Sequence, residues 1–347
     1  MNQNNNYLSK EATAFIKGIA LVFMFIHHFF TLPEDVYVEQ VRFLYSEGFA
    51  KLFCAPFKIC VPIFAFITGY VYFFCKNKNL KYSIKKATDL WISYVAVLLV
   101  VLVPLVLLKL YSFSPMDFVL DLLALTRTII SFNWYIIFYI LSIFLLPILS
   151  RAIEKKPLLT VLLSIILSFL ICKILPGMIP EKLLVFRQIP DDMQWFPCVI
   201  SGYVFARFNL FTTAKRTISS TNPFITFLIY LILMVIPFVS RNYIPEFDFI
   251  TVPLFVFGIS SFFEMIKYKN ILKPINVIGK YSMYMWFFHC IFFNALKPYT
   301  QPILFYPQNF ALVLCFGLII CIIPSIVVSK IINLIIRNKN LLLGYET

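Results

Sequence analysis

Apolar runs long enough to cross a lipid bilayer recur along the whole chain. A helical run of about 18 residues or more can cross a hydrocarbon core of roughly 30 Å. Because no water is available there to bond backbone groups, such a run folds as a helix or as part of a closed barrel. Barrel strands alternate apolar and polar residues, whereas the stretch VAVLLVVLVPLVLL at 95–108 does not alternate. The sequence therefore predicts an all-α, polytopic bundle of transmembrane helices.

The composition excludes a soluble domain. Hydrophobic residues make up 61% of the 347 positions and charged residues only 13%, against about a quarter charged in soluble proteins. The net charge of +14 comes from short basic clusters between the apolar runs, where lipid headgroups and topology account for it. We therefore predict a lipid-bilayer protein with no nucleic-acid partner. The eight cysteines show no CxxC or metal spacing, so we predict neither disulfides nor a metal site.

The apolar runs, separated by charged breaks, predict about ten spans and a single membrane domain over 1–347. The first run is expected to be retained, because no signal-peptide cleavage site follows it. The spans are 13–32, 52–75, 88–110, 132–150, 157–175, 193–210, 223–240, 248–265, 276–295 and 309–336. With the amino terminus inside, the cytoplasmic segments hold 18 basic residues and the exterior segments nine. This bias predicts that both termini are cytoplasmic, with 1–12 as a short polar tail.

The stretch 112–131 is the ambiguous part of this topology. It carries Asp117, Asp121 and Arg127, which make it too polar for an easy span. We predict an exterior or re-entrant amphipathic helix packed against protein. If it crossed the membrane, the count would become eleven and the carboxyl terminus would lie outside. No repeat of fixed period is visible in the sequence, which disfavours a transporter built from inverted repeats.

The first span carries ionisable groups on one face. Lys17 and His28 are eleven residues apart, or 1100° of helix, so they lie within 20° of one face, whereas His27 lies 80° away. His28 lies roughly 16 Å further along the axis than Lys17. Intramembrane ionisable groups are costly and mark functional sites, so this pair predicts the wall of a polar cavity. The alternative is that His28 hydrogen-bonds a neighbouring helix. His27 is expected to pack or to support the site.

Two further groups of polar residues are candidates. Ser282 and His289 in the ninth span are seven residues apart, again within 20° of one face. They are about 10 Å apart along the axis, too far for a nucleophile–base contact on one straight helix. They are expected to face the same cavity as His28. Lys81, Lys85 and Lys86 precede the third span, where they either set topology or bind phosphates of a cytoplasmic cofactor.

Five motifs in order resemble the acyltransferase-3 family of bacterial integral-membrane O-acyltransferases. They are KGIALVFMFIHH (17–28), VPIFAFITGYVYFF (61–74), NWYIIFYILSIFLLPIL (133–149), QWFPCVISGYVFAR (194–207) and VIGKYSMYMWFFHCIF (277–292). The resemblance implies a stand-alone membrane enzyme of the bacterial plasma membrane. Such an enzyme moves an acyl group, usually acetyl from acetyl-CoA, to a hydroxyl on the exterior side, without a metal. The expected acceptors are cell-envelope polysaccharides or lipid-linked sugars; a homo-oligomer or partner protein is left open.

The resemblance also suggests roles for individual residues. His28 matches the family's essential histidine, as a base or as a transiently acylated group, and Lys17 takes a position usually held by arginine. The family has two basic residues three apart before its third helix; Lys86 matches the first, but Asp89 stands at the second. We predict that the cofactor is bound by Lys17, Lys81, Lys85 and Lys86. We predict that Trp134, Ser282, His289 and Arg187 line the reaction chamber.

Two other classes of function compete with this prediction. A transporter or flippase of a lipid-linked saccharide would also need a polar intramembrane cavity, but no thioester donor. An accessory protein that only binds a partner would need neither. The exterior acids Asp117, Asp121, Asp191 and Asp192 are candidates for sugar recognition in the enzyme and transporter readings alike. The sequence leaves the acceptor and the acyl chain open.

Overall fold

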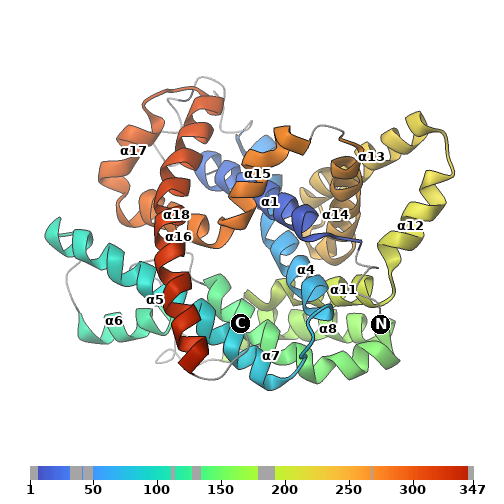
Figure 1. The fold of residues 1–347 in the computed structure, drawn as a ribbon, viewed down its shortest axis with the longest axis horizontal. Helices are drawn as coiled ribbons and strands as arrows, with labels where there is room; N and C mark the ends of the chain where they lie inside the picture. The colour runs from blue at the N-terminus through green and yellow to red at the C-terminus, as the bar shows by residue number, and fades with distance from the viewer. Residues whose placement is uncertain are drawn as a thin grey trace.

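The computed structural model describes residues 7–31, 41, 50–110, 114–126, 134–178, 192–266 and 269–342, and these contain helices and no strands (Figure 1). The first helix, α1 (Lys10–Phe30), begins where the Ser9 side chain accepts a hydrogen bond from the Ala12 amide at 3.0 Å. This cap satisfies one of the amides that the first turn leaves without a partner.

Each of the ten predicted spans contains a helix. The helices after α1 are α4 (Cys60–Phe73), α5 (Leu80–Leu107), α6 (Pro115–Leu122), α7 (Trp134–Lys155), α8 (Pro157–Lys173), α9 (Leu175–Met178), α11 (Phe196–Arg207), α12 (Leu210–Ser219), α13 (Pro223–Arg241), α14 (Asp248–Met265), α15 (Lys273–Lys280), α16 (Ser282–Cys290), α17 (Lys297–Phe305) and α18 (Phe310–Leu342). Short turns of 3-10 or π-helix join several of them.

Within the described residues, seven segments are long and apolar enough to cross a membrane. They are Lys10–Phe30, Leu52–Phe73, Leu80–Leu107, Trp134–Lys155, Pro223–Arg241, Pro245–Met265 and Phe310–Asn340. The other three predicted spans are shorter: α8 has 17 residues and α11 has 12. The ninth is interrupted at Tyr281, between α15 and α16. The helical membrane fold is therefore confirmed, while the count of ten and the cytoplasmic termini stay predictions.

The polar stretch after α5 does not form a span among its described residues. Helix α6 has eight residues, or about 12 Å of helical rise, far less than a bilayer core. It is held against α5 by two hydrogen bonds. Trp91 Nε1 donates to the Leu122 carbonyl at 2.8 Å, and the Tyr94 hydroxyl donates to the Asp121 carbonyl at 2.6 Å. The buried Asp121 carboxylate accepts a bond from the Thr126 hydroxyl at 2.6 Å, which is a structural role.

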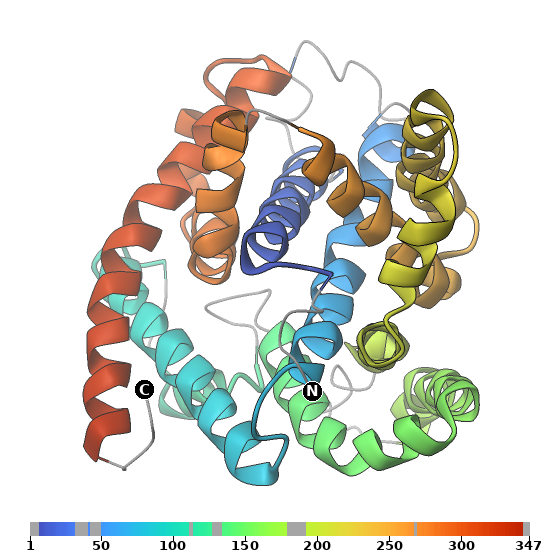
Figure 2. The same cartoon turned by 45° about the vertical axis from the view of Figure 1, so that its right-hand side comes forward.

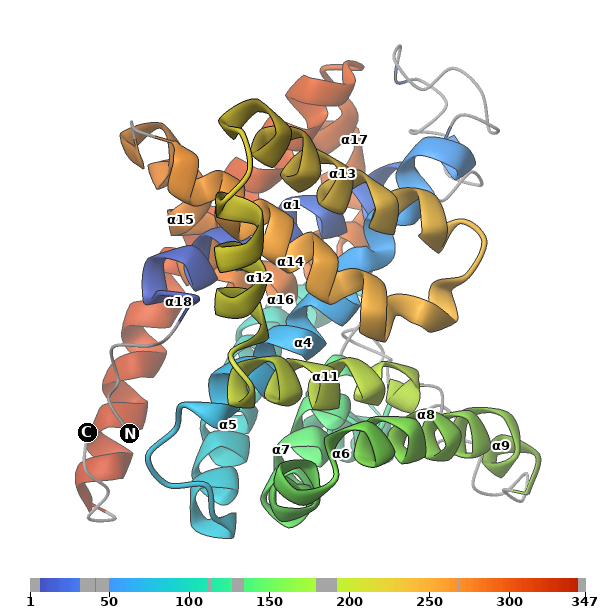
Figure 3. The same ribbon diagram turned by 90° about the vertical axis from the view of Figure 1, so that its right-hand side faces the viewer.

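Helix α1 runs through the middle of the bundle. It packs against α4, α14, α15, α16 and α18 (Figure 2). Helices α7, α8 and α11 pack on one another as a layer on one side of the molecule (Figure 3). The central position of α1 buries much of its surface, which places Lys17 and His28 inside the protein rather than against lipid.

Two glycines bring α4 and α11 into backbone contact. A Cβ on Gly69 would lie 1.8 Å from the Val199 carbonyl oxygen, and a Cβ on Gly202 would lie 2.0 Å from the Phe66 carbonyl oxygen. Each glycine thus meets the residue three positions before the other one, as in small-residue crossings of membrane helices. The two helices share a short sequence, ITGYV at 67–71 and ISGYV at 200–204. This local repeat was present in the sequence and marks the crossing.

A second glycine pair joins α1 to α15. A Cβ on Gly18 would lie 2.1 Å from the Ile275 carbonyl oxygen, and a Cβ on Gly279 would lie 1.7 Å from the Ala14 carbonyl oxygen. Only glycine allows backbones to approach this closely. The neighbouring residues in the sequence are lysines, Lys17 beside Gly18 and Lys280 beside Gly279. The crossing therefore brings two cationic side chains to one place.

Candidate active site

The two histidines that the sequence singled out are in direct contact. His28, near the end of α1, and His289, on α16, lie with Nδ1 of His28 2.7 Å from Nε2 of His289. Their rings are nearly parallel, with an interplanar angle of 17° and centroids 5.0 Å apart. His289 is buried, whereas His28 is half-buried. The alternative drawn from the sequence, that His28 hydrogen-bonds a neighbouring helix, is therefore observed, although the sequence did not identify His289 as the partner.

The hydrogen bonds of His289 determine the tautomers of the pair. His289 Nδ1 bonds to the Trp286 carbonyl oxygen, which only accepts, so this nitrogen carries the proton. In a neutral imidazole the other nitrogen is then an acceptor, and His289 Nε2 accepts from His28 Nδ1–H. The remaining nitrogen of a neutral His28, Nε2, therefore carries a lone pair. This is the state that a general base requires.

A cavity of about 550 Å³ borders His28; His289, which was predicted to line the same chamber, is not among its lining residues. Its lining comes from α1, α4, α5, α7, α15, α16 and α18, and includes Lys17, His28, Lys86, Trp134 and Ser282. Five predicted site residues from four helices therefore line one cavity, and His289 contacts His28 without lining it. The volume is typical of a site that encloses a small ligand. The catalytic and binding roles of these residues stay predictions.

Other predicted site residues lie elsewhere. Lys81 is exposed and Lys85 is half-buried, and neither lines the cavity. On α5 the cavity is met by Lys86, Asp89 and Ser93, which are three and four residues apart and so share a face. Of the other candidates, Arg187 and Asp191 lie outside the described residues, Asp117 is half-buried in the first turn of α6 and Asp192 is buried before α11.

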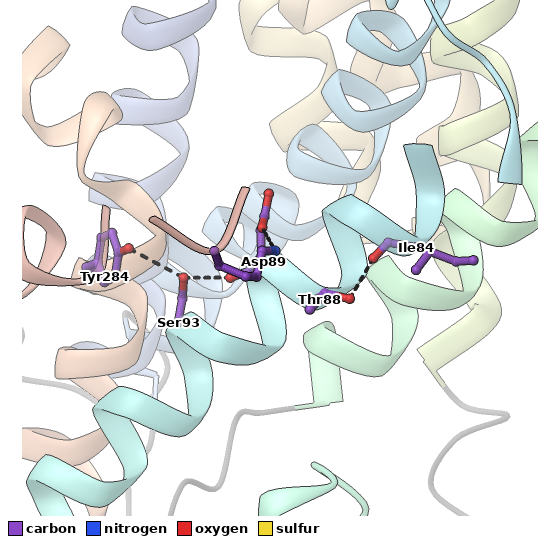
Figure 4. Close-up of polar contacts among 6 residues, drawn as sticks. Ile84, Thr88, Asp89, Ser93 and Tyr284 are labelled. Atoms are coloured by element: carbon purple, nitrogen blue, oxygen red, sulfur yellow. Dashed lines mark hydrogen bonds and ion pairs between the residues drawn. The ribbon is translucent and has the colours of Figure 1, made fainter. Parts of the chain in front are cut away.

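The acidic residue on this face of α5 is paired. Lys339, near the end of α18, lies with its Nζ 2.5 Å from Oδ1 of Asp89. Further along α5, the Ser93 hydroxyl donates to the Asp89 carbonyl at 2.8 Å and lies 3.4 Å from the Tyr284 hydroxyl (Figure 4). Asp89 stands where the family pattern has a second basic residue. Its pairing with Lys339 compensates the negative charge that this departure introduces.

Sequence reasoning missed part of the cavity wall. Tyr135 and Tyr139 on α7 and Ser329 and Asn333 on α18 also line it. Both pairs are four residues apart, so each lies on one helix face. Polar residues that recur every four positions in the last span, at Ser325, Ser329 and Asn333, were a usable signal. The part of the chain that the structure describes contains no group of three or more His, Cys, Asp or Glu residues that could hold a metal ion.

The fold and the site together define a class of protein. A helical membrane bundle encloses a polar cavity, and a hydrogen-bonded histidine pair lies against it with three lysines, Lys17, Lys86 and Lys280, on the wall. Lysine side chains can bind an anionic ligand and histidine side chains can move a proton, so the cavity contains groups for both. The model of a family described as "Acyltransferase domain" matches residues 14–330, nearly the whole chain, and the chain belongs to this family of acyltransferases. No curated protein and no solved structure matches the chain.

Proposed function

We propose that this membrane acyltransferase moves an acetyl group from cytoplasmic acetyl-CoA to a hydroxyl of an extracytoplasmic cell-surface polysaccharide or lipid-linked sugar, across a bacterial plasma membrane. The observation that carries the proposal is the His28–His289 hydrogen bond of 2.7 Å beside the cavity. A relay of this kind prepares His28 to take a proton from a hydroxyl. Acyl transfer to oxygen requires such a base.

The residues present suit an acyl-CoA donor. Lysine ammonium groups bind phosphates as point charges, and Lys17, Lys86 and Lys280 all line the cavity. Apolar and aromatic residues, among them Phe64 and Trp134, line other parts of it and suit the arm that carries the acyl group. When bound, acetyl-CoA supplies an acetyl thioester. The chain itself supplies the base, the orientation and the shielding from water.

The proton is handled by the histidine pair. His28 Nε2 takes it from the acceptor hydroxyl as the oxygen bonds to the acetyl carbon, and returns it to the thiolate sulfur as the carbon–sulfur bond breaks. His289 holds His28 in the required tautomer through its bond to the Trp286 carbonyl, as a second group orients a catalytic histidine in other enzymes. Ser282 and Tyr284 also line the cavity, where their hydroxyls are proposed to contact the bound acyl donor.

Transfer of radiolabelled acetyl from acetyl-CoA tests this proposal. Membranes containing the wild-type protein are expected to label a cell-envelope fraction in base-labile form, whereas His28→Ala abolishes labelling by at least about 10²-fold. Thermal unfolding of the purified variant should match the wild type and should still shift upward with acetyl-CoA. Retained labelling in His28→Ala removes the catalytic role of His28. If acetyl-CoA does not raise the melting temperature of the wild type, acetyl-CoA is not the donor. This is the result expected for a transporter or flippase of lipid-linked saccharides.

A further inference from the structure

A second cavity, of about 720 Å³, lies between α1, the end of α4 and α15. We call it the vestibule; it is lined by Leu8, Lys10, Thr13, Ala14, Lys17, Val71, Phe74, Cys75, Lys273, Asn276, Val277, Gly279 and Lys280. Three of these residues, Lys17, Val71 and Lys280, also line the cavity that borders His28. The two cavities therefore adjoin at these three residues.

The vestibule is strongly cationic. Four of the lining residues are lysines, Lys10 and Lys17 on α1 and Lys273 and Lys280 on α15, and none of the described lining residues is an aspartate or a glutamate. The backbone contacts of Gly18 and Gly279 hold α1 and α15 together. The four lysines are therefore kept close to one another by helix packing. Such a concentration of lysines suits a ligand that carries more than one phosphate.

A buried hydrogen-bond acceptor adds a second requirement. Oδ1 of Asn276 is buried and has no hydrogen-bond partner among the described residues, and Asn276 lines the vestibule. A buried acceptor without a donor is costly, so a ligand that brings an N–H or O–H group is favoured there. Phosphatidylglycerol brings hydroxyl donors but only one phosphate for four lysines. A ligand that carries several phosphates and an adenine amino group meets both requirements.

We propose that the vestibule binds the 3′-phosphorylated adenosine diphosphate end of acyl-CoA. Lys10 and Lys273 hold phosphates, Asn276 accepts a hydrogen bond from the adenine amino group, and Lys17 and Lys280 hold the diphosphate where the cavities meet. The pantetheine arm then runs past Val71 towards His28, which lies roughly 16 Å along α1 from Lys17. This inference rests on the proposed use of acyl-CoA. It moves the nucleotide site from Lys81 and Lys85 to α1 and α15.

Binding measurements on Lys10→Ala/Lys273→Ala test the phosphate part, because these two lysines line the vestibule and not the catalytic cavity. The matched control is Lys155→Ala/Lys156→Ala, which removes two exposed lysines that line neither cavity. With the full chain in phosphatidylcholine nanodiscs, affinity for acetyl-CoA should fall at least about tenfold in the first double variant only. Affinity for acetyl-4′-phosphopantetheine should be unchanged in both. Equal affinity of the two double variants for acetyl-CoA overturns the proposal.

Asn276→Ala tests base recognition. Its affinity for acetyl-CoA should fall several-fold, whereas its affinity for the analogue with hypoxanthine in place of adenine should equal that of the wild type. If Asn276→Ala loses the same affinity for acetyl-CoA and for the hypoxanthine analogue, Asn276 does not recognise the adenine amino group.

Nanodiscs that contain phosphatidylglycerol test whether the vestibule instead binds the phosphate of a lipid headgroup. If Lys10→Ala/Lys273→Ala loses stabilisation by phosphatidylglycerol but keeps its acetyl-CoA affinity, the vestibule is a lipid site. If the wild type binds no acetyl-CoA at all, the proposed donor fails instead.

Discussion

Two helix crossings in this protein are built in the same way but lie in different surroundings. At the α4–α11 crossing, Gly69 and Gly202 bring two buried helices into backbone contact. At the α1–α15 crossing, Gly18 and Gly279 do the same, but Gly279 is the only buried residue of α15. Most residues of α4 and α11 are buried, so we expect the first crossing to have little room to relax. The second can relax by moving α15 outward.

The residues that precede the glycines also differ between the two crossings: one bonds a neighbouring helix and the other lines the cavities. Ser201 precedes Gly202, and its hydroxyl donates to the Phe249 carbonyl at 2.8 Å, which ties α11 to α14. Lys17 precedes Gly18 and lines both cavities. We propose that one glycine contact positions structural groups and that the other positions a cation for a ligand. In this proposal the same kind of glycine contact serves stability at one crossing and function at the other.

The largest expected effect is on the buried crossing. Gly69→Ala or Gly202→Ala places a methyl group about where a backbone oxygen lies, so the free energy of unfolding should fall by about 3 kcal/mol or more. Gly177→Ala is the matched control, because nothing lies within 4 Å of a Cβ there, and alanine is the better helix former. Thermal unfolding in detergent measures both. Equal melting temperatures for Gly69→Ala and Gly177→Ala would show that the α4–α11 contact does not constrain the fold.

At the second crossing, Gly279→Ala should separate function from stability. We expect α15 to move away from α1, at a cost of about 1 kcal/mol in unfolding free energy, near the low end for overpacking. Lys280 moves with the helix, so KM for acetyl-CoA should rise roughly tenfold or more, since small misplacements are costly in a binding site. Kinetics alongside thermal unfolding check both. A stability loss as large as that of Gly69→Ala would erase the distinction between the two crossings.

The residues before the glycines sharpen the comparison. Lys17→Met should raise KM for acetyl-CoA about tenfold, because it removes the ammonium group proposed to bind the ligand's phosphates. We expect little loss of stability. Ser201→Ala removes one hydrogen bond and should cost about 1 kcal/mol of stability without a change in KM. Measuring KM and the melting temperature for both variants gives the test. The comparison fails if Lys17→Met leaves KM unchanged or if Ser201→Ala alters it.

The smallest effect is expected where an ion pair, rather than a glycine contact, joins two helices. Asp89 on α5 and Lys339 on α18 are each about one-fifth exposed. Asp89→Asn should lower the unfolding free energy by about 1 kcal/mol or less, and by less at high salt because exposed charges are screened. A double-mutant cycle with Lys339→Met measures the coupling. A coupling energy that is independent of salt would mark the pair as a buried, structural bond.

Much of the site could be predicted because it depends on positions along single helices. The stripe of Lys17 and His28 follows from 100° per residue, and the cavity borders both. The non-spanning character of the stretch around α6 followed from its acidic residues, and the described part agrees. The choice among Lys81, Lys85 and Lys86 could not be made, because the sequence does not say which face of α5 points inward. Only Lys86 lines the cavity.

By itself the sequence determined the helical membrane fold, since long apolar runs leave no other way to satisfy the backbone in lipid. It also determined which helix faces carry polar groups. Only the tertiary structure decided what those groups meet. His28 and His289 are 261 positions apart, and Asp89 and Lys339 are 250 apart. Their contacts depend on how far each helix slides and turns against its neighbours. That register is fixed by close packing at residues such as Gly18 and Gly279, not by the residues that make the contact.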